Sequence, residues 1–330
     1  MEAAAVSGDY ESFCDRFASE GACVDALFSA KWPAGFVCPR CSHTQAYALR
    51  CRRLLYECSG CGHQTSLLVG TVMEGSRTPL RKWFLAMFLI SRPEKGTSAI
   101  EAAATLKVTY KTAWLILHKL RHVMQQANGR DLLSGIVRVN TAKYGNPYNF
   151  TMHQHPQEHY FFAGAAIDER EQLTKLRVEH VAATSYREGS ATRQERHAFM
   201  SRFADACAVD PIPDADRYKR SRFAPIQLVC KQMCRWINDT FHGIGPKHLQ
   251  AYFDEFCWRF NNGIRGFRLP ERLLQLCAAT PVLTYKAIIG RPAELIVPKD
   301  PFYVTDWHRA RAFWSQKKAS KLRKLSKHAG

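Results

Sequence analysis

The sequence predicts an α+β protein of several domains, and three observations support this. Two closely spaced cysteine pairs mark a small unit near the start of the chain. Apolar residues at helical spacing follow over residues 78–126. Short β-branched and aromatic runs then alternate with polar turns up to residue 181. A chain of 330 residues is long enough for two or three small domains with their own cores.

The charge balance indicates a polyanionic partner. Lysine and arginine total 47 against 29 acidic residues, a formal charge of +18, so nucleic acid is the expected partner and a merely basic surface is the alternative. Hydrophobic content of 46% argues against a disordered chain. The longest apolar run, residues 83–90, is too short to span a membrane, and the first residues lack a secretion signal. We therefore expect a cytoplasmic protein without a membrane partner.

The cysteine pairs have the spacing of a zinc site. Cys38 and Cys41 form one C-x-x-C knuckle, and Cys58 and Cys61 form a second. Two such knuckles supply four thiolates to one tetrahedral zinc ion, here in a closed and therefore structural site. The residues between them alternate enough to form a hairpin. The alternative is buried or redox-active cysteine, and three nearby residues could exchange as ligands: Cys51, His43 and His63.

Residues 78–126 read as three helices. The first begins at Thr78 and Pro79. The second, capped by Thr97 or Ser98, has apolar residues at Ile100, Ala103, Ala104 and Leu106, and a short turn follows it. The third has them at Ala113, Trp114, Leu117, Leu120 and Met124. This layout is that of a helix-turn-helix, whose second helix would offer DNA four residues: Tyr110, Lys111, Thr112 and Lys119. An ordinary antiparallel helix pair is the alternative.

The second half of the chain reads as an α/β domain. Residues 135–140, 160–168 and 174–181 are predicted strands. Residues 248–260 form an amphipathic helix whose apolar face holds Leu249, Tyr252, Phe253, Phe256 and Phe260. Four polar residues of this helix, His248, Asp254, Glu255 and Arg259, are candidates for an active site. We expect most of them to lie on the helix surface or to support site residues without touching a metal.

Three stretches carry a family resemblance. Residues 66–90 (SLLVGTVMEGSRTPLRKWFLAMFLI), 109–121 (TYKTAWLILHKLR) and 240–262 (TFHGIGPKHLQAYFDEFCWRFNN) resemble the zinc-ribbon insertion-sequence transposases, the bacterial relatives of the Merlin transposons. The resemblance implies a zinc ribbon and a helix-turn-helix in front of a ribonuclease-H-like domain. It also implies metal-dependent DNA strand cleavage and transfer, transposon ends as the DNA partner, and self-association.

The acids that this family uses to hold metal are missing. The resemblance places the first metal ligand, an Asp at the end of the first strand, at Asn140. The second acid has no clear counterpart, with Asp205 and Asp210 as the nearest candidates. The third family position falls on Gln232, and the Lys that accompanies it in the family falls on Cys234. An alignment shifted by one residue would include Lys231 instead. Mg²⁺ requires anionic oxygen ligands, so these replacements predict a degenerate centre.

Three hypotheses follow from these replacements. The first is a transposase-like DNA-binding protein that cannot cut DNA. The second is an active DDE-type transposase that binds Mg²⁺ through acids located elsewhere, such as Asp168, Asp205 or Glu255. The third is a zinc-stabilised protein–protein adaptor.

The end of the chain is strongly basic. Residues 307–328 read as a helix that would bind DNA through several cations, among them Lys317, Lys318, Lys321, Arg323 and Lys324. A solvated basic tail is the alternative. Residues 217–223 form a second basic cluster in a predicted loop. The resulting domain boundaries are an N-terminal helical segment at 1–30, a zinc ribbon at 31–70, a helix-turn-helix region at 71–130, a ribonuclease-H-like core at 131–262 and a basic extension at 263–330.

Overall fold

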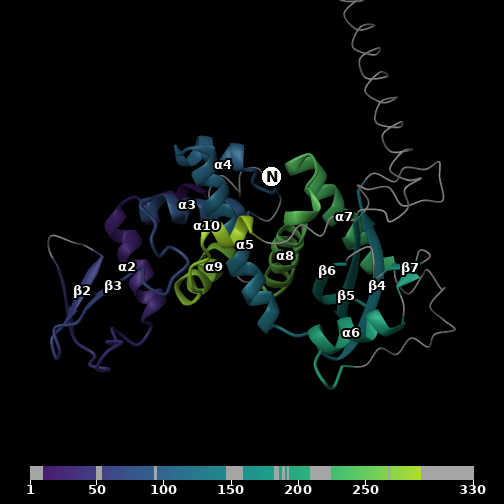
Figure 1. The fold of residues 1–330 in the computed structure, drawn as a ribbon, viewed down its shortest axis with the longest axis horizontal. Helices are drawn as coiled ribbons and strands as arrows, with labels where there is room; N and C mark the ends of the chain where they lie inside the picture. The colour runs from purple at the N-terminus through teal and green to yellow at the C-terminus, as the bar shows by residue number, and fades with distance from the viewer. Residues whose placement is uncertain are drawn as a thin grey trace, which may run out of the picture.

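The fold was established from a computed structural model of the chain. It describes residues 10–49, 54–92, 95–145, 159–181, 186–187, 190–191, 193–208, 224–266 and 268–290. The described part contains a small three-stranded sheet, a central group of helices, and a larger three-stranded sheet with its own helices (Figure 1). No helix in these residues is long and apolar enough to cross a lipid bilayer. The predicted α+β architecture with an N-terminal ribbon is therefore confirmed, while the basic segments at 217–223 and 307–328 lie outside the described residues.

The small sheet is the predicted ribbon. Strands β1 (Ala46–Ala48), β2 (Leu55–Cys58) and β3 (Gln64–Ser66) pair antiparallel in chain order. Helix α2 (Glu20–Lys31) lies beside this sheet, and the Phe28 ring centroid is 5.1 Å from that of Tyr56 on β2. These aromatic contacts attach the ribbon to the central helices.

Four helices form the central body together with α2. They are α3 (Leu80–Ser91), α4 (Ala99–Leu106), α5 (Tyr110–Arg130) and α9 (Leu269–Ala279). Leucines of α9 join the same buried core as Trp83, Met87 and Leu117. Residues 269–279, predicted to belong to a C-terminal extension, thus pack inside the N-terminal core. They are followed by the short helix α10 (Tyr285–Ile289).

Helix α3 begins differently from the sequence-based prediction. The first backbone N–H groups of α3, which have no partner within the helix, are capped by Glu20 of α2. The Glu20 carboxylate accepts hydrogen bonds from the N–H of Leu80 at 2.6 Å and from that of Arg81 at 3.1 Å. Pro79 occupies the N-cap position, so the helix starts two residues after Thr78. A cap supplied from another helix leaves no local sequence signal.

Helices α4 and α5 are joined by the three residues 107–109. The Ser98 hydroxyl caps α4, accepting from the backbone N–H of Glu101 at 3.2 Å. Lys107 adopts a left-handed conformation, with φ of 51°, and Thr109 caps α5. The prediction that Ile100 lies on the buried face is wrong. Ile100 is 74% exposed, and the buried residues of the eight-residue helix α4 are Ala102 and Leu106.

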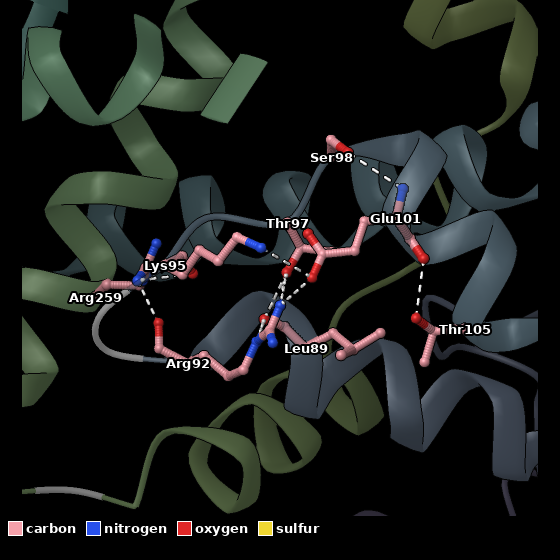
Figure 2. A network of polar contacts seen from close by, with 8 residues as sticks. All are labelled: Leu89, Arg92, Lys95, Thr97, Ser98, Glu101, Thr105 and Arg259. Atoms are coloured by element: carbon pink, nitrogen blue, oxygen red, sulfur yellow. Dashed lines mark hydrogen bonds and ion pairs between the residues drawn. The ribbon is translucent and has the colours of Figure 1, made fainter. Parts of the chain in front are cut away.

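A polar network fixes the start of α4 to the rest of the molecule (Figure 2). The Glu101 carboxylate lies 2.7 Å from an Arg92 nitrogen and 3.5 Å from Lys95 Nζ. Thr97 is buried and donates to the carbonyl of Leu89, which excludes it as the cap. Arg259 of helix α8 (Pro246–Ile264) donates to the carbonyl of Arg92, so this network also reaches the second half of the chain.

The larger sheet consists of β4 (Ile136–Tyr144), β5 (His159–Ile167) and β6 (Leu173–His180), paired antiparallel in that order. The second and third strands were predicted within one residue of these bounds. The first strand continues four residues beyond its predicted end, because residues 141–144 pair with residues 159–162 of β5. Asn140 therefore lies in the middle of β4, opposite Ala163.

Helices cover both faces of this sheet. Ala142, Phe161 and Val178 face the helices α7 (Ala224–Phe241) and α8 (Pro246–Ile264). Val137, Val139 and Phe162 face the opposite side, where Phe199 of α6 (Arg193–Phe203) packs on them. Side chains alternate along a strand, so Asn140 points to the same side as Ala142, toward α7. A minor two-stranded sheet, β7 (Tyr186–Arg187) and β8 (Ser190–Ala191), precedes α6.

The long helix α5 connects the two halves of the molecule. Its C-terminal part packs against α8, where Arg121 pairs with Glu255 and the Asn128 side chain donates to the carbonyl of Asp254 at 2.8 Å. On α8 the predicted apolar face is confirmed, with Leu249, Tyr252 and Phe253 buried. Asp254, Glu255 and Arg259 are buried as well, so they are not helix-surface positions.

Candidate functional site

Four cysteines of the ribbon converge on one point. The sulfur of Cys38 is 3.7 Å from that of Cys61, and the sulfur of Cys41 is 3.6 Å from that of Cys58. All four sulfurs lie within 4.8 Å of one another. Zinc bound tetrahedrally at about 2.3 Å from each sulfur would separate the sulfurs by about 3.8 Å. The cluster therefore fits a structural zinc ion.

The backbone of the two knuckles explains this convergence. In the first, the N–H of Cys38 donates to His43 and the N–H of Ser42 donates back to Cys38. In the second, Cys58 and Gly62 repeat this pair of hydrogen bonds, and Gly62 has the left-handed conformation that a glycine adopts without strain. Within the residues that the structure describes, neither His43 nor His63 joins the group of possible ligands, and Cys51 lies outside them.

A second feature is a cavity of about 610 Å³ between β4 and α7, which we term the β4–α7 cavity. Asn140 and Cys234, two of the three degenerate positions, both line it. The remaining lining residues are Thr141, Ala142, Lys143, Phe161, Gln227, Cys230, Lys231, Arg235, Asn238 and Asp239. The structure thus brings together a residue from the first strand and one from α7 that are far apart in the sequence.

Gln232 does not share this cavity. Its side chain is exposed on another face of α7, whereas Gln227 lines the cavity. Gln227 precedes Cys234 by seven residues, two helical turns, so both lie on one face of α7. Counting back two helical turns from Cys234 in the sequence could have identified Gln227 as a residue of the same site.

The cavity offers neutral and positive groups rather than carboxylates. Lys231 and Arg235 contribute positive charge, and Asp239 is the one acid among the described residues lining it. Burial raises the pKa of Cys234 to about 11, so its thiol is protonated at neutral pH. The amide oxygen of Asn140 accepts from the backbone N–H of Thr141 at 2.8 Å. Such a donor set suits an anion better than Mg²⁺.

The acids considered as substitutes have other roles. The Asp168 carboxylate accepts from the backbone N–H groups of Arg170 and Gln172 in the turn between β5 and β6. Asp205 accepts from the N–H of Cys207. None of Asp168, Asp205 and Glu255 lines the β4–α7 cavity, and Asp210 lies outside the described residues.

The candidate DNA-binding residues of α5 separate into two groups. Tyr110 and Lys111 are exposed, and Lys111 Nζ lies 5.1 Å from the centroid of the Tyr285 ring. Thr112 is half-buried. Lys119 is only 7% exposed, contrary to its predicted place on an open face, because its turn of α5 faces Trp83 and Val72. The candidates Lys317, Lys318, Lys321, Arg323 and Lys324 lie outside the described residues.

Comparison with known proteins identifies two segments of the chain. Residues 18–64 match the family model of a transposase zinc-ribbon domain, and residues 204–261 match that of an ISXO2-like transposase domain. A protein of Halobacterium salinarum, "Uncharacterized protein in transposable element ISH50", is 33% identical over 100 residues, which are 30% of this chain and 33% of that protein. No solved structure matches the chain.

Both matched models describe domains of insertion-sequence transposases. The resemblance to zinc-ribbon insertion-sequence transposases is confirmed, since the chain carries their zinc ribbon together with a segment of their transposase domain. The second match includes α7 and most of α8, whereas Asn140 and the strands β4 to β6 precede it.

Proposed function

We propose that this chain is a transposase-like DNA-binding protein of an insertion sequence that does not cut DNA through a two-metal centre. The β4–α7 cavity carries this proposal. It contains the amides of Asn140 and Gln227 and the thiol of Cys234, from the first strand and from α7. A two-metal transposase site would require carboxylates at such positions.

The physical argument is electrostatic. Two Mg²⁺ ions bring four positive charges, which anionic oxygens must balance. Removing one partner from a buried charge cluster costs roughly 3–5 kcal/mol. In this cavity Lys231 and Arg235 add repulsion, and Asp239 alone among its described residues is an acid. We therefore expect these groups to bind too little Mg²⁺ for catalysis.

DNA binding does not require those metals, because affinity comes largely from neutralising phosphates. The net charge of +18 supplies the cations. The exposed N-terminal end of α5, at Tyr110 and Lys111, supports a helix-turn-helix interpretation of α4 and α5. The antiparallel strands β4 to β6 followed by helices support a ribonuclease-H-like core. Self-association and recognition of transposon ends are further parts of this proposal.

The decisive experiment uses the full-length wild-type protein on duplexes carrying candidate terminal repeats. Binding is measured at several salt concentrations, and strand cleavage is measured with Mg²⁺ or Mn²⁺. We expect binding that falls steeply with salt and no cleaved product. Metal-dependent nicking would instead establish the active DDE-type transposase. Salt-independent binding, or none, would favour the protein–protein adaptor.

A further inference from the structure

A second basic cavity lies beside helix α5. It has a volume of about 290 Å³ and is bounded by α5, by Trp83 of α3 and by the loop at residues 75–78; we term it the α5 cavity. Its polar lining consists of Ser76, Arg77, Thr78, Lys111, Thr112 and Lys119. Three of these side chains are cationic, and none of the described residues lining the cavity is acidic.

Lys119 is the unusual member of this set. Its side chain is 7% exposed, and its ammonium lies 3.4 Å from the carbonyl of Val72, at the outer limit of a hydrogen bond. The Trp83 ring centroid is 5.9 Å away. Burial lowers the pKa of Lys119, an effect that Glu74 opposes through its charge. The Glu74 carboxylate itself accepts from the N–H of Gly70 and does not line the cavity.

A buried ammonium with one long hydrogen bond is unfavourable unless an anion completes its surroundings. An ammonium carries three donors, and the contact with Val72 uses one of them. Lys119 lines the cavity together with Arg77 and Lys111, and both of these side chains are exposed.

The loop contributes a hydroxyl to the same space. Ser76 Oγ accepts hydrogen bonds from Trp83 Nε1 at 3.1 Å and from the N–H of Thr78 at 3.2 Å. A hydroxyl oxygen that accepts two hydrogen bonds has its own proton left to donate. The cavity therefore presents three cations and an oriented hydroxyl, which are the donors that a phosphate binds.

We propose that the α5 cavity binds one backbone phosphate of duplex DNA, contacted by Lys119 from within and by Arg77 and Lys111 at the rim. This inference rests on the proposed DNA binding and deepens it. The phosphate would position the duplex against the N-terminal end of α5, where Tyr110 is exposed. Lys119, although it cannot reach a DNA groove, thereby becomes a phosphate ligand.

The test compares single-charge variants of the full-length protein. Fluorescence anisotropy measures binding to a labelled duplex of about 20 base pairs between about 50 and 200 mM salt. The cavity variants are Lys119→Met, Lys111→Gln and Arg77→Gln. The matched control is Arg170→Gln, which removes one exposed cation from the turn between β5 and β6. We expect each cavity variant to bind several-fold more weakly and to reduce the slope of log K against log salt by about 1.

A stability measurement separates binding from folding. A lysine retained for the fold alone would lower the melting temperature when changed to Met, whereas we expect Lys119→Met to melt at or above the wild-type temperature. An unchanged salt slope in Lys119→Met overturns the phosphate site while leaving DNA binding intact. If Lys119→Met does not fold, the double variant Arg77→Gln/Lys111→Gln replaces it, and an unchanged slope there has the same meaning. Absence of DNA binding by the wild-type protein overturns the proposed function itself.

Discussion

Arg121 of α5 and Glu255 of α8 form an ion pair inside the molecule. The Arg121 Nε atom is 2.7 Å from a Glu255 carboxylate oxygen, and the two side chains are 2% and 0% exposed. Arg259 lies 3.7 Å from the other oxygen, and the Arg121 guanidinium lies 4.1 Å from the Tyr252 ring centroid. Helix α5, which begins at the candidate DNA-binding residues, is thus attached to α8, which packs on the sheet. Glu255 has a structural position, away from the β4–α7 cavity.

The first prediction concerns this pair. We expect Glu255→Gln to lower the free energy of unfolding by about 3–5 kcal/mol, because Arg121 and Arg259 remain buried without their counter-charge. Chemical denaturation measures the change. The double variant Arg121→Met/Glu255→Gln removes one of the two uncompensated charges and should recover part of the loss. Equal stability of the single and double variants would show that the uncompensated charge of Arg121 does not cause the loss.

Local patterns predicted those parts of the fold that depend on nearby residues. Strands β5 and β6 were located within one residue, and helix α8 within two residues at its start and four at its end, because their apolar periodicity is continuous. The four zinc ligands were found because a ribbon encodes its knuckles within a short segment.

Tertiary pairing decided the rest. Strand β4 continues past Asn140 because residues 141–144, which are a polar and mixed run, pair with β5. Lys119 is buried because α3 and the residues before it pack on that turn of α5. The β4–α7 cavity joins Asn140 with Gln227, whose positions are related only through the packing of α7 on the sheet. Such relationships have no signature in a single sequence.

The zinc ribbon gives the second prediction. Cys38→Ser or Cys61→Ser should release zinc and unfold the ribbon, because a small unit of three short strands has little core besides the metal site. Metal analysis of the purified protein and limited proteolysis measure the two effects. Cys207→Ser changes an exposed cysteine outside the cluster and serves as the control. Full zinc content in either ribbon variant would refute four-thiolate coordination.

The third prediction concerns the degenerate centre. Asn140→Asp alone should not produce strand cleavage with Mg²⁺, because Gln227 and Cys234 remain uncharged and Lys231 and Arg235 remain positive in the same cavity. A nicking assay on supercoiled DNA measures the outcome, with duplex binding as the control for correct folding. Robust Mg²⁺-dependent nicking by this single variant would contradict our account of the cavity.

The fourth prediction concerns pH. Burial, together with the neighbouring His180, lowers the pKa of His159 from 6.5 to about 4. Between these values the unfolded chain takes up a proton that the folded protein does not, so stability should fall as the pH drops from about 6.5 toward 4. His159→Phe should flatten this part of the stability–pH curve, measured by denaturation at several pH values. His197→Gln, which removes an exposed histidine, should retain the wild-type slope. An unchanged slope in His159→Phe would exclude His159 as its source.

The last prediction concerns a close approach within the sheet domain. Gly164 of β5 lies directly beneath Phe199 of α6: a Cβ atom there would lie 2.9 Å from Phe199 Cζ and 3.0 Å from Leu133 Cδ1. Phe199 is fully buried. We therefore expect Gly164→Ala to lower the free energy of unfolding by about 1–3 kcal/mol.

A double-mutant cycle tests the cause of that loss. Phe199→Leu shortens the opposing side chain, so Gly164→Ala should cost less in its presence than in the wild-type background. The control is Gly129→Ala in α5, where no heavy atom lies within 4 Å of the added Cβ, and it should raise stability by up to about 1 kcal/mol. If Gly164→Ala costs the same in both backgrounds, the contact with Phe199 does not explain the glycine. If the cost falls, the close approach of Phe199 is the reason that β5 carries a glycine at this position.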